Sequence, residues 1–385
     1  MVNQTSLIFS VFLASATLTL ASCGSSAKNN DRTAAPSAMS ALDVAAESLG
    51  IQSKSPEAIY GGKIGNYPIL MQIAESDSKY YYIKFRKYID LEYEKKKDKI
   101  YLKSELTGDS FVLTGQGGIL RGTMTTASGK NLPVALSQRK LEKEFSDPAL
   151  NDTSLNALDK ILLSGSKFEP TKEKTIEKYK LQFLVEKSSG AEFPRFIAGL
   201  NPSTLRRINA ELRRIHYETV LFLASSCSEA NSSISEPFVG DGVISFAQLN
   251  SYDCGGAHPN FGEVGFTVSL STGQEVSQEQ LQIGGVGAAG ASWTKIESDD
   301  FPSKLVGLLN MLHPDSMKRP SDDDSCDYSD PDAWQSPQWY ITKEGVRFIP
   351  NFPAAQRACN LEEFATVPLK FVRIPLQADG TMPGQ

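Results

Sequence analysis

One short segment combines residue types that could do acid–base chemistry. Asp253 and His258 lie in the run Asp-Cys-Gly-Gly-Ala-His-Pro-Asn, which ends at Asn260. An imidazole near a carboxylate can act as a general base or as a ligand, so Asp253 and His258 are the candidate catalytic pair. The alternative is a rigid turn, pinned by a disulfide at Cys254, whose histidine bonds the backbone. A metal site needs three or four ligands, so we expect no metal and no cofactor here.

Two other runs carry residues that bind ligands in some proteins. Gly285–Gly290 reads GVGAAG and matches G-x-G-x-x-G, but a dinucleotide site needs this motif between a strand and a helix. Its neighbours are typical of a loop, so we expect no nucleotide. Asp322–Asp324, with Asp327 and Asp330, form an acidic loop that could hold Ca²⁺ weakly. The loop lacks the glycine and closing glutamate of an EF-hand, and a solvated acidic loop is the alternative.

Aromatic residues gather near the C-terminal part of the chain. Trp334, Trp339 and Tyr340 could stack on a sugar, and packing in the core is the alternative. The nucleophile motif G-x-S-x-G and the zinc motif H-E-x-x-H are both absent from the sequence. These absences argue against the common hydrolase chemistries.

Composition narrows the class of protein. The chain has 385 residues, of which 40% are hydrophobic and 22% charged, with a formal net charge of −6. This composition is that of a globular protein, and the length predicts two or three domains. Phosphate contacts need an excess of Lys and Arg, so we expect no nucleic-acid partner.

The N-terminus is typical of an exported lipoprotein. Leu7–Leu20 is largely apolar, which is too short to span a bilayer but suits the apolar region of a signal peptide. The start, MVNQTS, lacks the usual positive charge. Leu20-Ala21-Ser22-Cys23 resembles a bacterial lipoprotein box, which implies cleavage before Cys23 and lipid attachment to it. Gly24, and not Asp, follows Cys23, which in a Gram-negative cell resembles the signal for sorting to the outer membrane, facing the periplasm.

The other four cysteines form an even set, which in an exported chain predicts two disulfides. Three pairings are possible. We favour Cys227–Cys254 and Cys326–Cys359 because each closes a loop of about 30 residues around a turn-rich region. Metal binding is the weaker alternative, because no two of these cysteines have C-x-x-C spacing.

The secondary-structure elements that must position these residues are predicted to form two domains, and the predicted fold class is α+β. Short alternating apolar runs punctuated by glycine predict a small all-β meander or barrel, followed by an antiparallel sheet packed against a long helix that begins at Ser203. In one predicted run, Tyr81, Ile83 and Phe85 share a face. Thr366–Ile374 is predicted as one strand. The expected organisation is a signal peptide (1–22), a flexible tether (23–55), a β-domain (56–140), a helical linker (141–173), an α+β domain (174–377) and a tail (378–385).

Several pieces of the last domain resemble a known envelope family. They are Gly199-Leu200-Asn201 before the long helix, the Gly-Gly-Ala-His run ending at His258, the turn Ser271-Thr272-Gly273, and Trp339–Val346. Their order resembles the extracytoplasmic domain of RsiV-like anti-sigma factors, a domain of largely unknown function that also precedes the catalytic part of some peptidoglycan deacetylases. The resemblance covers about residues 174–377 and implies an α+β fold. In the RsiV-like branch this domain binds lysozyme.

These observations support three hypotheses. The first is a lipid-anchored, non-enzymatic envelope protein that binds or senses a protein, such as lysozyme, or a cell-wall glycan. The second is an envelope hydrolase acting on peptidoglycan, with Asp253 and His258 at its centre. The third is a purely structural envelope module.

Overall fold

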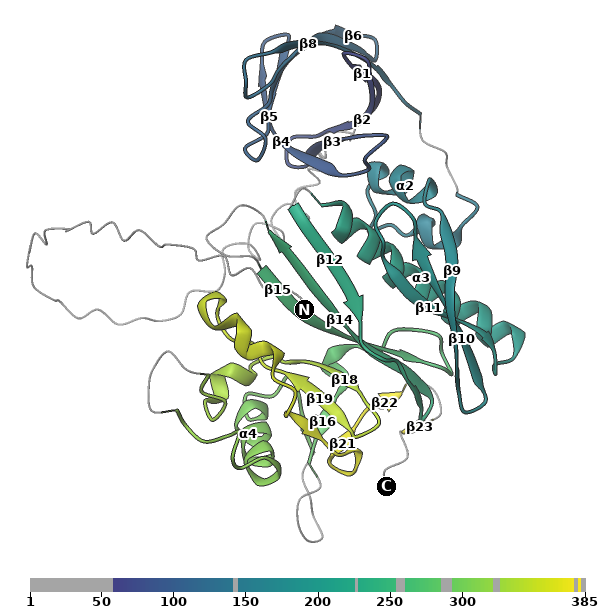
Figure 1. Cartoon of the computed structure of the whole chain (residues 1–385), viewed down its shortest axis with the longest axis vertical. Helices are drawn as coiled ribbons and strands as arrows, with labels where there is room; N and C mark the ends of the chain where they lie inside the picture. The colour runs from purple at the N-terminus through teal and green to yellow at the C-terminus, as the bar shows by residue number, and fades with distance from the viewer. Residues whose placement is uncertain are drawn as a thin grey trace, which may run out of the picture. The chain divides into compact units, whose positions relative to one another are not determined.

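Eight antiparallel strands close into a barrel at the start of the described chain (Figure 1). The computed structural model describes residues 58–140, 145–225, 228–253, 260–284, 293–320, 326–376 and 380–381. The strands are β1 (Ala58–Ile64), β2 (Tyr67–Ile73), β3 (Ser78–Tyr82), β4 (Tyr88–Lys96), β5 (Lys99–Lys103), β6 (Ser110–Gln116), β7 (Ile119–Thr125) and β8 (Asn131–Gln138). Each pairs with the next, and β1 pairs with β8. The predicted closed meander is confirmed.

Alternation along the strands fills the barrel with side chains. Ile69, Met71 and Ile73 of β2 point inward with Leu102 of β5 and Leu113 of β6, and all five are buried. An eight-stranded barrel is just wide enough for side chains to fill it. The expected face of Tyr81, Ile83 and Phe85 is wrong, because β3 ends at Tyr82 and the chain turns there.

The outer wall of the barrel carries a second apolar set that packs against helices. This set forms one buried cluster with residues of α2 (Ala157–Ser164) and α3 (Pro202–Ala224), and its members are Ile59, Leu70, Tyr81 and Tyr88. The Tyr88 hydroxyl also donates to Asp159 Oδ1 at 2.7 Å. Strands β1 to β3 are therefore covered on both faces, which is why Leu70 and Gln72 are buried beside the inward-facing residues of β2.

The predicted helical linker 141–173 is only partly helical. It contains the short 3₁₀ helix η1 (Pro148–Asn151) and α2, but β9 (Phe168–Ile176) begins inside it. Strand β9 is the edge of the sheet β11–β10–β9. Most of its side chains are exposed, so it lacks the apolar alternation from which a strand is predicted.

The sheet formed by β9, β10 (Tyr179–Glu186) and β11 (Glu192–Ala198) shares a core with α3. Asn201 caps that helix by accepting the Thr204 amide at 3.0 Å, and Pro202 occupies its first position. Ile208, Leu212 and Ile215 form its buried stripe.

The remaining strands form several small antiparallel sheets. In one of them β14 (Val243–Asp253) pairs with β12 (Ser228–Ile234), β13 (Phe238–Gly240) and β15 (Asn260–Ser269). The others are formed by β16 (Gln282–Ile283), β17 (Thr294–Lys295) and β21 (Val372–Arg373), by β18 (Gln338–Ile341), β19 (Val346–Ile349) and β20 (Thr366–Val367), and by β22 (Pro375–Leu376) and β23 (Gly380–Thr381).

Helix α4 (Phe301–Leu312) and four short 3₁₀ helices complete the described chain: η2 (Gln278–Gln280), η3 (Pro331–Trp334), η4 (Ala354–Leu361) and η5 (Leu369–Phe371). The predicted strand Thr366–Ile374 is wrong, since η5 interrupts it after Pro368, which has no amide to donate. Among the described residues, no helix is both long and apolar enough to cross a membrane.

Candidate functional site

The residues of the predicted acid–base pair are not seen together. His258 lies outside the described residues, as do Cys23, Cys227, Cys254 and the glycine-rich run Gly285–Gly290. Asp253 is the last residue of β14, opposite Ser228 of β12. The catalytic hypothesis and the Cys227–Cys254 pairing therefore stay predictions.

The aromatic candidates lie in the core rather than on a binding surface. The side chains of Trp334 and Trp339 have no exposed area. Their Nε1–H groups donate to the carbonyl oxygens of Tyr328 and Gln278, each at 2.9 Å. Tyr340 is partly buried, and burial together with the Glu263 carboxylate raises the pKa of its hydroxyl to about 12. For the two tryptophans, stacking on a sugar is ruled out in this conformation, and core packing is confirmed.

The predicted disulfide Cys326–Cys359 is present, with 5.6 Å between the two Cα atoms. It joins the loop before η3 to the 3₁₀ helix η4. Next to it, the Tyr328 hydroxyl donates to the Cys359 carbonyl oxygen at 2.8 Å. The Phe352 amide donates to Asn360 Oδ1, also at 2.8 Å. The bond and its neighbours thus hold two segments together that lie about 30 residues apart in the sequence.

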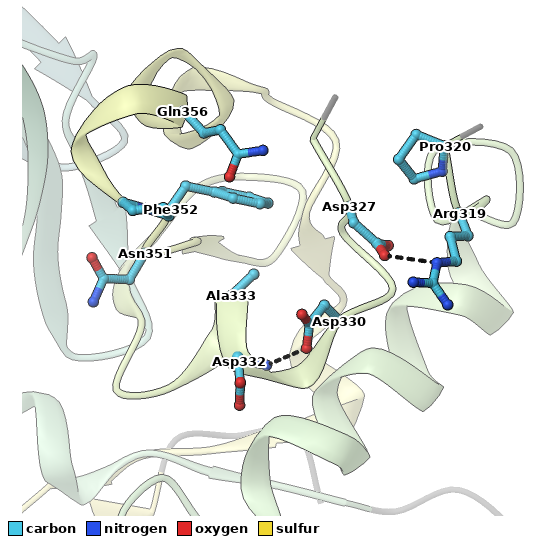
Figure 2. Close-up of a pocket in the computed structure, with 10 residues that line it drawn as sticks. Arg319, Pro320, Asp327, Asp330, Asp332, Ala333, Asn351, Phe352 and Gln356 are labelled. Atoms are coloured by element: carbon cyan, nitrogen blue, oxygen red, sulfur yellow. Dashed lines mark hydrogen bonds and ion pairs between the residues drawn. The ribbon is translucent and has the colours of Figure 1, made fainter. Parts of the chain in front are cut away.

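Between these two segments is a cavity of about 320 Å³. Figure 2 shows carboxylates on the 327–332 segment at one side and the side chains of Asn351, Phe352 and Gln356 at the other. The lining residues are Arg319, Pro320, Asp327, Asp330, Asp332, Ala333, Asn351, Phe352, Pro353 and Gln356. We call this cavity the aspartate pocket.

The charge of the aspartate pocket is negative. Asp327 Oδ2 lies 3.4 Å from Arg319 Nε, a cation whose side chain is 82% exposed. Asp330 accepts the Asp332 amide at 2.9 Å, and Asp332 accepts the Gln335 side-chain amide at 2.8 Å. The lining thus carries three carboxylates and one arginine, together with an aromatic ring and two amide side chains. This lining suits a cationic group on a body that can form hydrogen bonds.

A metal ion does not fit the described part of this loop. Within the described residues, no group of three or more His, Cys, Asp or Glu side chains is arranged to hold one. Asp322–Asp324 of the acidic loop lie outside those residues. The proposed Ca²⁺ site therefore gains no support from Asp327 and Asp330, which are engaged in turns of their own loop.

A second cavity, of about 440 Å³, lies between β9–β11 and the 232–237 segment. Its charges are already paired inside the protein: Lys172 Nζ lies 2.7 Å from Glu192 Oε2, and Lys174 pairs with Glu236. A charged ligand would have to displace one of these pairs. The aspartate pocket, with its excess of carboxylates, is the better candidate site.

Only part of the aspartate pocket can be recognised from the sequence. Asp327 and Asp330 belong to the predicted acidic loop, and the spacing of Cys326 and Cys359 indicated the crosslink. No sequence motif marks Asn351, Phe352 and Gln356. They line the pocket only because the fold brings them close to the 327–332 segment, and this proximity cannot be recognised from their order in the chain. No family model and no curated protein matches this chain.

Proposed function

We propose that this protein is a lipid-anchored binding or sensing protein of the bacterial cell envelope. Its anchor is the lipidated Cys23, and its position is the outer membrane, facing the periplasm. The observation that carries the binding function is the aspartate pocket, a negatively charged cavity held by a disulfide. In this proposal the pocket takes a cationic group of a protein or of a cell-wall glycan.

The proposed ligand class follows from the lining of the pocket. The cationic group would be a lysine or arginine side chain or the amine of an amino sugar, and it would form an ion pair with Asp330 and Asp332. Asn351 and Gln356 would form hydrogen bonds with neutral groups of the same ligand. Electrostatic complementarity of this kind contributes specificity and association rate. The resemblance to RsiV-like domains makes lysozyme the first protein to test. We also propose that α3 and the antiparallel sheet that it covers belong to one α+β domain, which extends to about residue 377 and includes all of β9 from Phe168.

Titration of the purified, oxidised protein with animal-type lysozyme tests this function. We expect saturable binding with a Kd of about 1 µM or tighter. The isosteric change Asp332→Asn should weaken binding about threefold to tenfold through loss of one charge. Asp315→Asn is the matched control, since Asp315 is 92% exposed, pairs with Lys318 and does not line the pocket.

Absence of binding up to about 100 µM, which corresponds to about −5.5 kcal/mol, would overturn the lysozyme assignment. Peptidoglycan fragments with free amines would then be compared with the same fragments after acetylation. Binding that needs the free amine would keep the glycan form of the proposal. Hydrolysis of either polymer would instead favour the enzyme hypothesis.

A further inference from the structure

The barrel exposes apolar side chains mainly at one of its ends. In an antiparallel meander, the connections after β1, β3, β5 and β7 all lie at the same end. Large apolar side chains protrude beside three of these four connections. They are Tyr67 (61% exposed), Ile83 (47%), Phe85 (60%) and Leu106 (52%). We call this set the barrel rim.

The two aromatic rings of the barrel rim are linked through Tyr82, which is half-buried between them. Tyr67 meets Tyr82 edge to face, with ring centroids 6.0 Å apart, and Tyr82 meets Phe85 at 6.3 Å. These contacts join the β1–β2 connection to the β3–β4 connection. Exposed apolar patches that are contiguous in this way mark sites of interaction.

Exposed lysines lie at the same end of the barrel as the rim. Lys84 lies with its Nζ 5.4 Å from the centroid of the Phe85 ring. The exposed residues Lys63, Lys103 and Lys130 lie at the same end of the barrel, where the acidic residues of the connections are Glu105 and Asp109. Aromatic and aliphatic tips among lysines are the composition of surfaces that enter the headgroup region of an anionic membrane.

We infer that the barrel rim is a membrane-contacting surface that docks on a bilayer containing anionic phospholipids. The tips belong to separate turns, so a fluid surface suits them better than a rigid protein groove. This inference rests on the proposed anchor at Cys23 for its location. Residues 24–57 separate Cys23 from β1, and a chain of this length can span at most about 120 Å, which is long enough for the rim to reach the membrane that holds the lipid.

Fluorescence quenching by brominated lipids tests this orientation. The full chain, carrying Phe85→Trp, is mixed with an excess of vesicles of 70% phosphatidylethanolamine and 30% phosphatidylglycerol, with bromine on the acyl chains. The signal of the unsubstituted protein is subtracted to remove its three native tryptophans. We expect the added indole to lose more than about half of its emission. Ile119→Trp is the matched control, because Ile119 is 49% exposed but follows the β6–β7 connection at the opposite end of the barrel.

The outcomes are separable. Quenching at position 85 without quenching at position 119 supports the rim, and Tyr67→Trp should repeat it if Phe85→Trp folds poorly. Equal quenching at both positions, or none at either, overturns the inference. Self-association that depends on the rim residues, without quenching, would instead indicate that the rim binds a second copy of this protein. The mass of the purified chain reports lipid attachment independently. A chain without acyl groups therefore refutes the anchor, while the quenching still decides the rim.

Discussion

The imidazole of His216 stacks on the ring of Phe193, with centroids 5.2 Å apart and planes 17° from parallel. The ring of Phe168 also contacts this imidazole, edge to face, with centroids 4.9 Å apart. His216 Nε2–H donates to the Ala191 carbonyl oxygen at 2.9 Å, and the side chain is buried. The pKa of His216 is lowered from 6.5 to about 4, mainly by this burial and also by the charge of Arg213, while the hydrogen bond to Ala191 and the charge of Glu186 oppose the shift.

The folded protein should therefore lose stability in mild acid. In the unfolded chain His216 takes up its proton as the pH falls below about 6.5, whereas in the folded chain it stays neutral until about pH 4. Its contribution is thus fully present above pH 6.5 and declines between pH 6.5 and 4. We expect a loss of about 2–3 kcal/mol in the unfolding free energy at pH 4.5 relative to pH 7, measured by urea titration.

His216→Gln isolates that contribution. Glutamine keeps a hydrogen-bond donor for the Ala191 carbonyl but does not take up a proton in this pH range. The loss of unfolding free energy between pH 7 and pH 4.5 should therefore be smaller in the variant than in the parent by about 2–3 kcal/mol. An identical pH profile for the two proteins would contradict this account.

Loss of the Cys326–Cys359 crosslink should destabilise the C-terminal region. The two cysteines are 33 residues apart, and closing a loop of this size stabilises by about 4 kcal/mol in the chain-entropy model. The double change Cys326→Ala/Cys359→Ala should lower the unfolding free energy by about 2–4 kcal/mol and abolish ligand binding at the aspartate pocket. Reduction of the parent protein under native conditions should give the same two effects, and unchanged binding after reduction would separate the pocket from the disulfide.

Arg214 of α3 holds three carboxylates. Its Nη2 lies 2.8 Å from Glu211 Oε1 and 2.6 Å from Glu275 Oε2, and its Nη1 pairs with Glu218. Burial raises the pKa of both Glu218 and Glu275, while Arg214 opposes the shift. Arg214→Met should cost about 3 kcal/mol at pH 7 because it leaves partly buried carboxylates unpaired.

This cost should shrink in acid. Without the arginine, the carboxylates bind protons more strongly in the folded protein than in the unfolded chain. The difference in unfolding free energy between the variant and the parent should therefore become smaller as the pH falls from 7 toward 5. The control is Arg206→Met on the exposed side of the same helix, for which we expect a change below about 0.5 kcal/mol. A deficit that stays constant with pH would contradict the electrostatic explanation.

Gly265 of β15 lies where this strand meets β18. A Cβ atom at Gly265 would lie 1.9 Å from the carbonyl oxygen of Trp339, whereas a Cβ at Gly262 meets no atom within 4 Å. Gly265→Ala should therefore force the two strands apart and lower the unfolding free energy by about 3 kcal/mol. Gly262→Ala in the same strand is the control, and equal effects of the two changes on thermal unfolding would refute this packing argument.

Local patterns were sufficient for much of the fold. Alternation in β2, β5 and β6 predicted the barrel interior, because the side-chain period of a strand is two in any context. Apolar spacing predicted that the long helix begins at Ser203, and α3 begins one residue earlier, at Pro202. Prediction failed at β9, whose exposed edge has no apolar face, and at Thr366–Ile374, where Pro368 precedes a turn of 3₁₀ helix.

The sequence by itself was sufficient to predict the closed meander, and it favoured the crosslink between Cys326 and Cys359 among three possible pairings, because both predictions use only residue type and spacing along the chain. Only the tertiary structure decided that Trp334 and Trp339 are buried and that the segment from Asn351 to Gln356 lines the same cavity as Asp327 and Asp330. It alone showed that the apolar tips at Tyr67, Phe85 and Leu106 stay exposed at one end of the barrel. These features depend on contacts between segments far apart in the chain, and no local pattern of residues encodes them.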